Sequence, residues 1–467
     1  MERLFGTDGV RALANVVLTP ELMLSLGRAL GSELADGAVR RPTVVVGRDP
    51  RPSGALLEAA FVAGLCSAGA DALTVGVLPT AAIAFLTPRF RADAGAVITA
   101  SHNPLEDNGL KLFDRDGYKY SEESEMRLEA LCRETSVAGV GPAAGARTPV
   151  RGLEVGRIRD RSDAAREAYA EHLVADLPDL DGLSITVDCA NGAAAAIAPE
   201  VYRRAGATVV EIASDRSGDK INVGVGATTP EYLQRSLTVG ITDIGLAHDG
   251  DADRLIAVDE RGRIVDGADL LAVFAVDAHA HGGLPGAGVV TTPMTNSGLG
   301  RSLKDQGICV SESAIGDRSV LRAMIEGGYR IGGEQSGHVI LLDRATTGDG
   351  VLSGLRLLEL MHRTGKRLHE LTEVWQRCPQ AVANVPVQDR RILERSPEVL
   401  RLAEDERRRL TALGGRLILR LSTIENVVRV VCEAPEQEQA DSVVERLVAS
   451  LASSIADGSV SEGDGRG

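Results

Sequence analysis

The stretch that decides the fold is Ala96-Val97-Ile98-Thr99-Ala100-Ser101-His102-Asn103-Pro104. Its apolar, β-branched run Val97-Ile98-Thr99 predicts a short buried strand. Asn103-Pro104 is a turn signal, because the residue before a proline is pushed out of the helical region. Ser101 is therefore expected on a loop at the carboxyl end of a strand, where open α/β sheets bind ligands. Taken alone, such a stretch is more often a polar loop without chemistry.

A second turn is expected directly after this loop, at Asp107-Asn108-Gly109-Leu110-Lys111. Asn-Gly is one of the dipeptides that mark turns. A hydroxyl on Ser101, an imidazole on His102 and an ammonium on Lys111 are thus predicted to crowd one short segment.

Composition limits the classes of protein that fit. A chain of 467 residues is too long for one hydrophobic core, so three or four domains are expected. Hydrophobic residues at 44% and charged residues at 25% are typical of a soluble globular protein. A net charge of −15 argues against a general nucleic-acid binder, although local arginines and lysines can still attract an anionic substrate into one cleft.

The cysteines and the N-terminal segment bear on the compartment. The 6 cysteines form no Cys-x-x-Cys pair, so neither a zinc site nor a disulfide framework is indicated. The opening residues contain no apolar signal region, and no stretch is long and uncharged enough to span a membrane. A cytoplasmic protein without a membrane or nucleic-acid partner is expected.

Strands alternate with helices along most of the chain, which predicts parallel or mixed α/β sheets. Thr19-Pro20 is a helix start, because Thr can cap the helix and Pro suits its first turn. Strands are predicted at 42–47, 72–77, 97–99, 183–188, 209–212, 244–247, 288–292 and 329–332. Helices are predicted from 20 and at 56–68, 81–86, 161–175, 269–279 and 350–361.

The recurring strand–helix layout indicates three related α/β units followed by a different C-terminal region. After Trp375 two strands, at 416–421 and 426–431, flank a polar turn, and a helix is predicted at 440–451, which indicates a smaller α+β domain. The domains are expected at 1–150, 151–258, 259–372 and 373–455. The Ser-, Gly- and Asp-rich tail from Ser453 is expected to be disordered, with the last domain boundary drawn at 455/456.

Asp249-Gly250-Asp251-Ala252-Asp253-Arg254 is the second chemically informative stretch. Carboxylates at i, i+2 and i+4 repel one another, and a bound cation relieves that repulsion. Oxygen-only ligands select a hard metal such as Mg²⁺ or Ca²⁺. An EF-hand is excluded because its sixth position should be Gly, and here it is Arg254. A solvated acidic turn is the remaining alternative.

Two further loops carry weaker signals. In Gly332-Gly333-Glu334-Gln335-Ser336-Gly337-His338, the glycines let backbone approach a ligand, Glu334 and Ser336 suit sugar hydroxyls, and His338 can act as an acid or base. In Arg420–Arg429, two arginines flank a hydroxyl pair on a turn, which suits a phosphate or carboxylate. A surface histidine on a Gly-rich turn and a plain hairpin explain these two loops equally well.

Together these stretches, in this order, resemble the α-D-phosphohexomutases over nearly the whole chain. Within that family they are most similar to the bacterial members that act on glucosamine phosphates. Several long motifs in family order are far more specific than any one motif. The matching segments are 5–11, 98–104, 107–111, 187–192, 249–254, 316–318, 332–338 and 347–350.

The resemblance implies a four-domain enzyme with one central cleft, three related mixed α/β domains and a smaller C-terminal α+β domain. It implies that Ser101 is a phosphoserine and that Asp249, Asp251 and Asp253 hold Mg²⁺ together with a phosphoserine oxygen. A sugar bisphosphate serves as activator and intermediate, and glucosamine 6-phosphate becomes glucosamine 1-phosphate. The expected oligomeric state is a monomer or homodimer.

The resemblance also implies roles for the remaining motif residues. The group around the transferring phosphoryl, which also handles protons, is Arg11, His102, Lys111, Arg254 and His338. Glu334 and Ser336 bind sugar hydroxyls. The phosphate that is not transferred is bound by Arg420, Ser422, Thr423 and Arg429.

The sequence departs from the family pattern in its last loop. That loop normally reads Arg-x-Ser-Gly-Thr-Glu-Pro, whereas Thr423, Ile424 and Asn426 stand here in place of Gly, Thr and Pro. A β-branched residue resists the φ > 0 conformation that glycine allows, so a backbone cradle for phosphate is reshaped. Two smaller departures are Ala12, for a usual Gly, and His248, where an aromatic or aliphatic residue is usual.

These departures leave three hypotheses open. The first is a working glucosamine-phosphate mutase with an unusual phosphate clamp. The second is a diverged relative that acts on another sugar or sugar-like phosphate, or that only transfers or hydrolyses a phosphoryl group. The third is a non-catalytic protein that senses sugar phosphates; retention of the residues around the transferring group argues against it.

Overall fold

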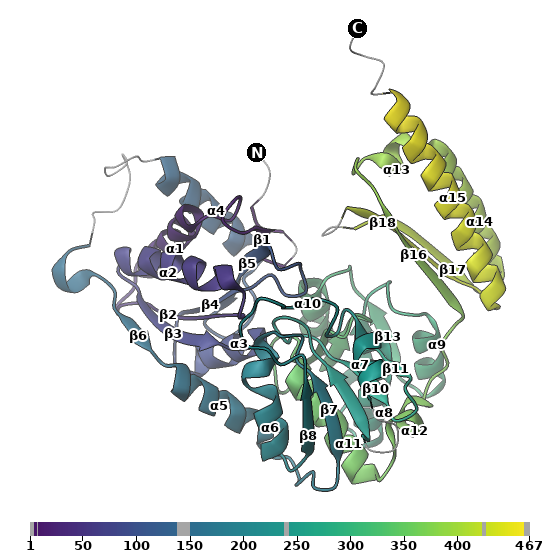
Figure 1. The fold of residues 1–467 in the computed structure, drawn as a ribbon, viewed down its shortest axis with the longest axis horizontal. Helices are drawn as coiled ribbons and strands as arrows, with labels where there is room; N and C mark the ends of the chain where they lie inside the picture. Colours follow the sequence, from purple (N-terminus) through teal and green to yellow (C-terminus); the bar gives the residue numbers. More distant parts are fainter. Residues whose placement is uncertain (1–3, 7, 138–149, 238–241, 423–425, 462–467) are drawn as a thin grey trace. The chain divides into compact units, whose positions relative to one another are not determined.

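The structure is a computed structural model that describes residues 4–6, 8–137, 150–237, 242–422 and 426–461. The chain forms two compact units, both visible in Figure 1. The larger comprises the chain up to Thr295 together with Leu303–Val374, and the smaller comprises Asn296–Ser302 together with the chain from Trp375 onward.

The first sheet of the larger unit has a parallel centre and an antiparallel edge. Its elements are β1 (Val10–Leu13), α1 (Pro20–Ala35), β2 (Thr43–Arg48), α2 (Pro52–Ser67), β3 (Asp71–Val77), α3 (Thr80–Arg89), β4 (Ala94–Ile98), β5 (Asp107–Asp114), α4 (Glu122–Val137) and β6 (Ile158–Asp160). The strand order is β1-β5-β4-β2-β3-β6. β2, β3, β4 and β6 are parallel to one another, while β5 is antiparallel to both of its neighbours, β4 and β1.

The second sheet has the order β11-β10-β9-β7-β8. It is formed with α5 (Ser162–Val174), β7 (Ser184–Asp188), α6 (Ala198–Arg204), β8 (Thr208–Ile212), α7 (Pro230–Ser236), β9 (Ile244–Ala247), β10 (Ile256–Asp259) and β11 (Ile264–Val265). The short 3₁₀ turns η1 (Gly152–Glu154) and η2 (Ala193–Ala196) lie before β6 and α6.

The third sheet has the order β13-β12-β14-β15. Its elements are α8 (Gly267–Ala280), η3 (Pro285–Ala287), β12 (Gly288–Thr291), α9 (Gly298–Asp305), β13 (Cys309–Glu312), α10 (Asp317–Gly327), β14 (Ile331–Gly333), β15 (Val339–Leu341), α11 (Gly350–Thr364) and α12 (Leu368–Thr372).

The three sheets repeat one topology. The strand orders β5-β4-β2-β3, β10-β9-β7-β8 and β15-β14-β12-β13 are the same path through the sheet. In each, the last parallel strand is followed by an antiparallel neighbour, so the chain reverses at β4–β5, β9–β10 and β14–β15. Ser101, the three aspartates and Glu334–His338 lie on these three reversals, one on each.

The smaller unit is an α+β layer. Its antiparallel sheet has the order β16-β18-β17, and α14 and α15 pack on one face around a core that includes Val399, Leu410, Val430 and Leu447. The elements are β16 (Gln380–Pro386), α13 (Ile392–Arg395), α14 (Pro397–Ala412), β17 (Arg416–Leu421), β18 (Val427–Glu433) and α15 (Gln437–Ser461).

The predicted class of mixed α/β sheets with a C-terminal α+β region is confirmed. The first helix starts as expected, with Thr19 Oγ1 accepting from the Leu22 amide. The first sheet continues past residue 150, because β6 pairs with β3.

The turn predicted at Asp107–Lys111 was wrong, because these residues lie in β5. Arg11 lies in the neighbouring strand β1. Asn108-Gly109 is a turn signal in sequence, but Gly109 is needed for close strand packing. A Cβ there would lie 2.4 Å from both the Thr99 and the Val10 carbonyl oxygens. The disorder predicted from Ser453 was also wrong up to Ser461, because Leu447, Leu451 and Ile455 continue the apolar face of α15. Residues 462–467 lie outside the described residues.

Helices α1 and α2 pack closely through glycines. A Cβ at Gly64 would lie 2.2 Å from the Leu24 carbonyl oxygen, and one at Gly27 would lie 2.1 Å from the Phe61 carbonyl oxygen. Since backbone atoms cannot move aside, a methyl group at either position forces the helices apart.

We expect Gly64→Ala to destabilise the protein by about 1–3 kcal/mol, although alanine is the better helix former by about 1 kcal/mol. Thermal denaturation should show a clearly lower melting temperature. Gly300→Ala is the matched control, because it is also helical and nothing lies within 4 Å of its added Cβ. Equal melting temperatures for the two variants would contradict the packing argument.

Candidate active site

Ser101 lies on the loop after β4, as predicted, and its backbone is held in an uncommon conformation. Its φ of +52° is in the left-handed region, which costs a non-glycine residue roughly 1 kcal/mol or more. The Ser101 amide donates to Thr99 Oγ1 (2.9 Å), and that hydroxyl donates to Asp49 Oδ2 (2.6 Å). These bonds hold the buried Ser101 side chain in one place.

Arg51 organises the same loop and was not among the residues that the sequence analysis singled out. Its guanidinium is fully buried and pairs with Asp49 Oδ2 at 3.0 Å. It donates to the carbonyl oxygens of Ser101 (2.8 Å) and Asn103 (2.9 Å), and also to those of Pro104 and Asp107. From the second sheet region, Asn222 Nδ2 also donates to the Ser101 carbonyl (2.9 Å).

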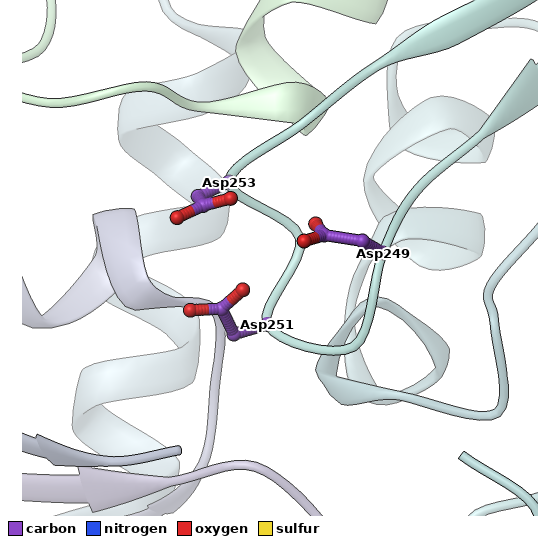
Figure 2. A group of neighbouring side chains, drawn as sticks. All are labelled: Asp249, Asp251 and Asp253. Carbon is purple, nitrogen blue, oxygen red and sulfur yellow. The ribbon is translucent and has the colours of Figure 1, made fainter. Parts of the chain in front are cut away.

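Asp249, Asp251 and Asp253 converge on the β9–β10 loop, and their carboxylates face a common point in Figure 2. One oxygen from each lies within 4.8 Å of the others, and all three residues are buried. Ala252 between them has a φ of +56°, which turns the chain tightly enough to bring the carboxylates together. Thr80 Oγ1 fixes Asp251 by donating to its Oδ2 at 2.5 Å.

Ser101 and the aspartates meet: Ser101 Oγ donates to Asp249 Oδ2 at 2.8 Å. Burial and the negative charges of Asp253 and Asp251 raise the pKa of Asp249 to about 7. Burial alone would also raise the pKa of Asp253, but the positive charges of Lys111 and His338 hold it well below its ordinary value. Lys111 Nζ contacts Asp251 Oδ2 (2.8 Å) and Asp253 Oδ2 (3.0 Å).

The donor set fits a hard divalent cation. Asp251 Oδ1 and Asp253 Oδ1 are buried, and no described residue gives either one a hydrogen bond. Three carboxylates so close together repel one another, and only oxygen atoms are offered. Mg²⁺ prefers such ligands and keeps coordination positions for a phosphate oxygen.

Cationic and imidazole groups surround Ser101. Arg254 Nε lies 3.8 Å from Asp249 Oδ2 and 3.8 Å from Asp253 Oδ1, and Arg11 Nη1 donates to Asn103 Oδ1 at 3.1 Å. His102 Nδ1 lies 3.3 Å from Ser101 Oγ. The nearby charge of Arg254, followed by burial, lowers the pKa of His102 to about 2, so its ring is neutral.

His338 reaches the same site from the third sheet. Its Nδ1 lies 3.7 Å from Asp253 Oδ1, and the Gly348 amide donates to its Nε2 at 3.1 Å. Burial lowers the pKa of His338, but Asp253 and Asp317 outweigh it and raise the pKa overall. The Gly348 bond acts in the opposite sense, because it requires an unprotonated Nε2. His338 therefore contacts both a carboxylate, which favours a proton on Nδ1, and an amide donor, which needs an unprotonated Nε2.

A partly buried charge cluster beside His338 was not predicted. Asp8 pairs with Arg11, Lys111 and Lys119, and Lys119 also pairs with Asp317. Asp8, Arg11, Lys111 and Asp317 lie in matching segments named above, but membership of separate segments does not show that these residues pair with one another and with Lys119.

The predicted sugar-binding residues lie on the β14–β15 loop. Glu334 Oε1 accepts from the Gly316 amide at 3.1 Å, while Ser336 is exposed. The geometry leaves the Ser336 hydroxyl accessible to a ligand.

In the smaller unit, Arg420 and Arg429 are direct cross-strand partners on β17 and β18. Like charges placed opposite each other destabilise a sheet, and an anion between them relieves this. Arg390, which the sequence analysis missed, donates to the Ser422 carbonyl (2.7 Å) and to Asn426 Oδ1 (2.9 Å). Ser422 is buried at the end of β17. Thr423 and Ile424 lie outside the described residues.

Comparison with known proteins identifies this arrangement. Models of the phosphoglucomutase/phosphomannomutase family match its alpha/beta/alpha domains I, II and III at residues 2–138, 167–262 and 266–378, and its C-terminal domain at 383–450. The chain belongs to the phosphoglucomutase/phosphomannomutase family.

Relatives within this family align along the whole chain. A phosphoglucosamine mutase of Rhodococcus jostii (strain RHA1) is 46% identical over 455 residues, covering 97% of this chain and 100% of the relative. One from Acidothermus cellulolyticus is 48% identical over 449 residues, covering 95% of each. The crystal structure of a phosphoglucomutase/phosphomannomutase family protein from Burkholderia thailandensis matches with a TM-score of 0.78 and 24% identity, covering 97% of each chain, which supports the fold.

Of the helices that the structure describes, none combines the length and apolar character needed to cross a bilayer.

We expect Arg51→Lys to destabilise this family member by at least about 2 kcal/mol, because lysine cannot donate to the loop carbonyls and to Asp49 together. A lower melting temperature and faster amide exchange at residues 99–106 should follow. Arg40→Lys is the control, since its pair with Asp93 is half exposed and its loss should change stability by less than about 1 kcal/mol. Equal effects of the two substitutions would mean that Arg51 does not hold the loop.

Proposed function

We propose that this chain is a phosphoglucosamine mutase that interconverts glucosamine 6-phosphate and glucosamine 1-phosphate. The observation that carries the proposal is the 2.8 Å contact between Ser101 Oγ and Asp249 within the aspartate cluster. A hydroxyl beside a divalent-cation site is what a phosphoenzyme needs, since phosphoryl transfer depends mainly on positioning and charge stabilisation. The relatives named phosphoglucosamine mutase support the choice of substrate.

The proposed cycle has two transfers. In the first, the bond between phosphorus and Ser101 Oγ breaks while a bond forms between phosphorus and a sugar hydroxyl oxygen, giving a sugar bisphosphate. The intermediate then reorients in the site. The bond between its other phosphorus and a sugar oxygen breaks while a bond forms between that phosphorus and Ser101 Oγ, and the released sugar oxygen takes a proton. When bound to Asp249, Asp251 and Asp253, Mg²⁺ would neutralise charge on the phosphoryl oxygens.

The side chains around Ser101 divide the remaining work. Burial lowers the pKa of Lys111, but Asp251, Asp253 and Asp8 raise it well above its ordinary value, so Lys111 stays charged and stabilises anionic oxygens. Arg11 and Arg254 bind the transferring group, and neutral His102 orients Ser101 Oγ. His338, whose ring lies among Asp253, Asp317 and the Gly348 amide, takes the proton of the attacking sugar hydroxyl.

The remaining predicted residues would bind the substrate. Glu334 and Ser336 accept and donate hydrogen bonds to sugar hydroxyls. Arg420, Ser422, Thr423 and Arg429 bind the phosphate that is not being transferred, and the cross-strand arginine pair supports this role. Arg390 would help by holding the ends of their loop.

A diverged substrate is the second candidate, because Thr423 and Ile424 stand where the family has Gly and Thr. Restoring Gly and Thr at these two positions separates the candidates. If the restored variant turns over ordinary hexose phosphates faster, the altered loop explains a diverged substrate. If turnover is unchanged, the loop gives no reason to expect a different substrate. Release of inorganic phosphate without isomerised sugar would instead indicate a phosphatase.

We expect Ser101→Ala to abolish turnover of glucosamine 6-phosphate, with a loss of several orders of magnitude, because no oxygen remains to carry the phosphoryl group. A coupled assay with a bisphosphate activator measures this. Intact mass spectrometry should find one phosphoryl group on the parent protein and none on the variant. Unphosphorylated but fully active parent protein would refute the phosphoserine cycle.

Removal of divalent cations should abolish mutase activity, and added Mg²⁺ should restore that activity. Asp251→Asn should weaken activation by Mg²⁺ by about 10-fold or more, since one of three charged ligands is lost. The control is Asp176→Asn, because Asp176 is exposed and pairs with Arg344 away from the triad. Activity that survives exhaustive chelation would exclude a metal-dependent mechanism.

A further inference from the structure

His248 is a buried histidine that the mechanism does not use. It directly precedes Asp249, follows β9, and has no exposed surface. Its Nδ1 lies 3.1 Å from the backbone carbonyl oxygen of Arg254. The side chain of residue 248 therefore bridges to residue 254 and closes a ring around the whole aspartate loop.

The contact determines which nitrogen carries the proton. A carbonyl oxygen can only accept, so Nδ1 must be the donor. In a neutral ring the other nitrogen, Nε2, is then an acceptor.

Tyr202 on α6 supplies the donor for that nitrogen. Its hydroxyl lies 3.3 Å from His248 Nε2, and the two rings stack with centroids 6.3 Å apart at 12°. In this tautomer Nε2 has no proton, so Tyr202 Oη is the donor in this contact; the Val351 carbonyl oxygen, 3.4 Å from the same hydroxyl, is a second acceptor for its proton. A hydroxyl that donates to Nε2 favours the tautomer in which Nδ1 donates to Arg254.

Two glycines of helix α11 leave room for the two ends of this chain of hydrogen bonds, which are the Arg254 carbonyl oxygen and the Tyr202 hydroxyl. A Cβ at Gly350 would lie 2.0 Å from the Arg254 carbonyl oxygen and 2.8 Å from His248 Nδ1. A Cβ at Gly354, one turn later, would lie 2.2 Å from Tyr202 Oη. The Gly350 amide also donates to the Ala252 carbonyl at 3.0 Å, so this helix contacts the aspartate loop directly.

We propose that His248, oriented by Tyr202, is a positioning residue that closes the aspartate loop and sets the three carboxylates and Arg254 for the cation and the phosphoryl group. The alternative is that the imidazole only fills space. This inference rests on the proposed metal site. It goes beyond it by assigning the loop's shape to one side-chain hydrogen bond. Partners that orient metal ligands typically contribute 10- to 100-fold to metal affinity.

The test uses substitutions that separate hydrogen bonding from packing. His248→Leu fills the space without a donor. His248→Asn places an amide N–H near the position of Nδ1, and His248→Gln places one near Nε2 instead. Tyr202→Phe removes only the hydroxyl. His362→Leu, at an exposed position on α11, controls for the loss of a histidine.

Binding of Mn²⁺ to the purified full-length chain, followed by electron paramagnetic resonance of free Mn²⁺, gives a readout independent of turnover. We expect His248→Leu and His248→Gln to weaken binding by about 10-fold or more. His248→Asn should retain most of the parent's affinity for Mn²⁺. Tyr202→Phe should weaken binding as His248→Leu does, but by a smaller factor. In the mutase assay, kcat should fall in the same order, with a smaller change in KM for the sugar phosphate.

The outcomes distinguish this inference from the proposed function. If the parent chain binds no Mn²⁺, the metal site itself fails. If the parent binds Mn²⁺ and His248→Leu binds it equally well, the positioning role is refuted and the metal site stands. If the leucine and asparagine variants lose affinity equally, or in proportion to their melting temperatures without metal, the role is packing alone. If His248→Leu does not fold, Tyr202→Phe and the asparagine–glutamine comparison still decide the question.

Discussion

The structure depends on holding three like charges together in a buried place. Asp249, Asp251 and Asp253 lie within 4.8 Å of one another and out of water, so burial and mutual repulsion both oppose their ionisation. The protein offsets part of that cost with Lys111, whose ammonium contacts two of the three carboxylates. Lys111 lies on β5, a strand buried along most of its length, so the charge is supplied by a rigid element. The compensation is incomplete, since two carboxylate oxygens lack a hydrogen-bond partner among the described residues, which is the donor set that a hard cation fits.

Repetition of one sheet topology brings the chemistry together. Each of the three sheets reverses direction after its last parallel strand, at β4–β5, β9–β10 and β14–β15. The carboxyl ends of parallel strands are where α/β sheets bind ligands. The first reversal carries Ser101, the second the three aspartates and Arg254, and the third Glu334, Ser336 and His338. A site built this way draws on three separate sheets, and no single domain can form it.

Local patterns predicted the elements and the loops, whereas contacts between distant residues could not be read from them. The strand before Ser101, the cap at Thr19 and the aspartate cluster follow from periodicity, capping and charge spacing within a few residues. Arg51, Asn222 and Thr80 were missed because their partners are 50, 121 and 171 positions away. Asn108-Gly109 misled for a related reason: the same dipeptide that favours a turn also allows the close strand approach seen in β5. The roles assigned to the individual site residues stay predictions.

The hydrogen bond between Ser101 and Asp249 requires the backbone of the Ser101 loop to pack directly against the backbone of the aspartate loop. A Cβ at Gly250 would lie 2.5 Å from the Ser101 carbonyl oxygen, and one at Gly192 would lie 2.4 Å from the Gly250 carbonyl oxygen. The glycine within the aspartate loop is therefore required by its neighbour on the first sheet. Since Arg51 and Asn222 both donate to that same Ser101 carbonyl, the oxygen can neither rotate nor retreat to admit a side chain. A contact of 2.8 Å between a serine hydroxyl and a buried carboxylate can be maintained only by such rigid backbone, because a shift of 1 Å would break it.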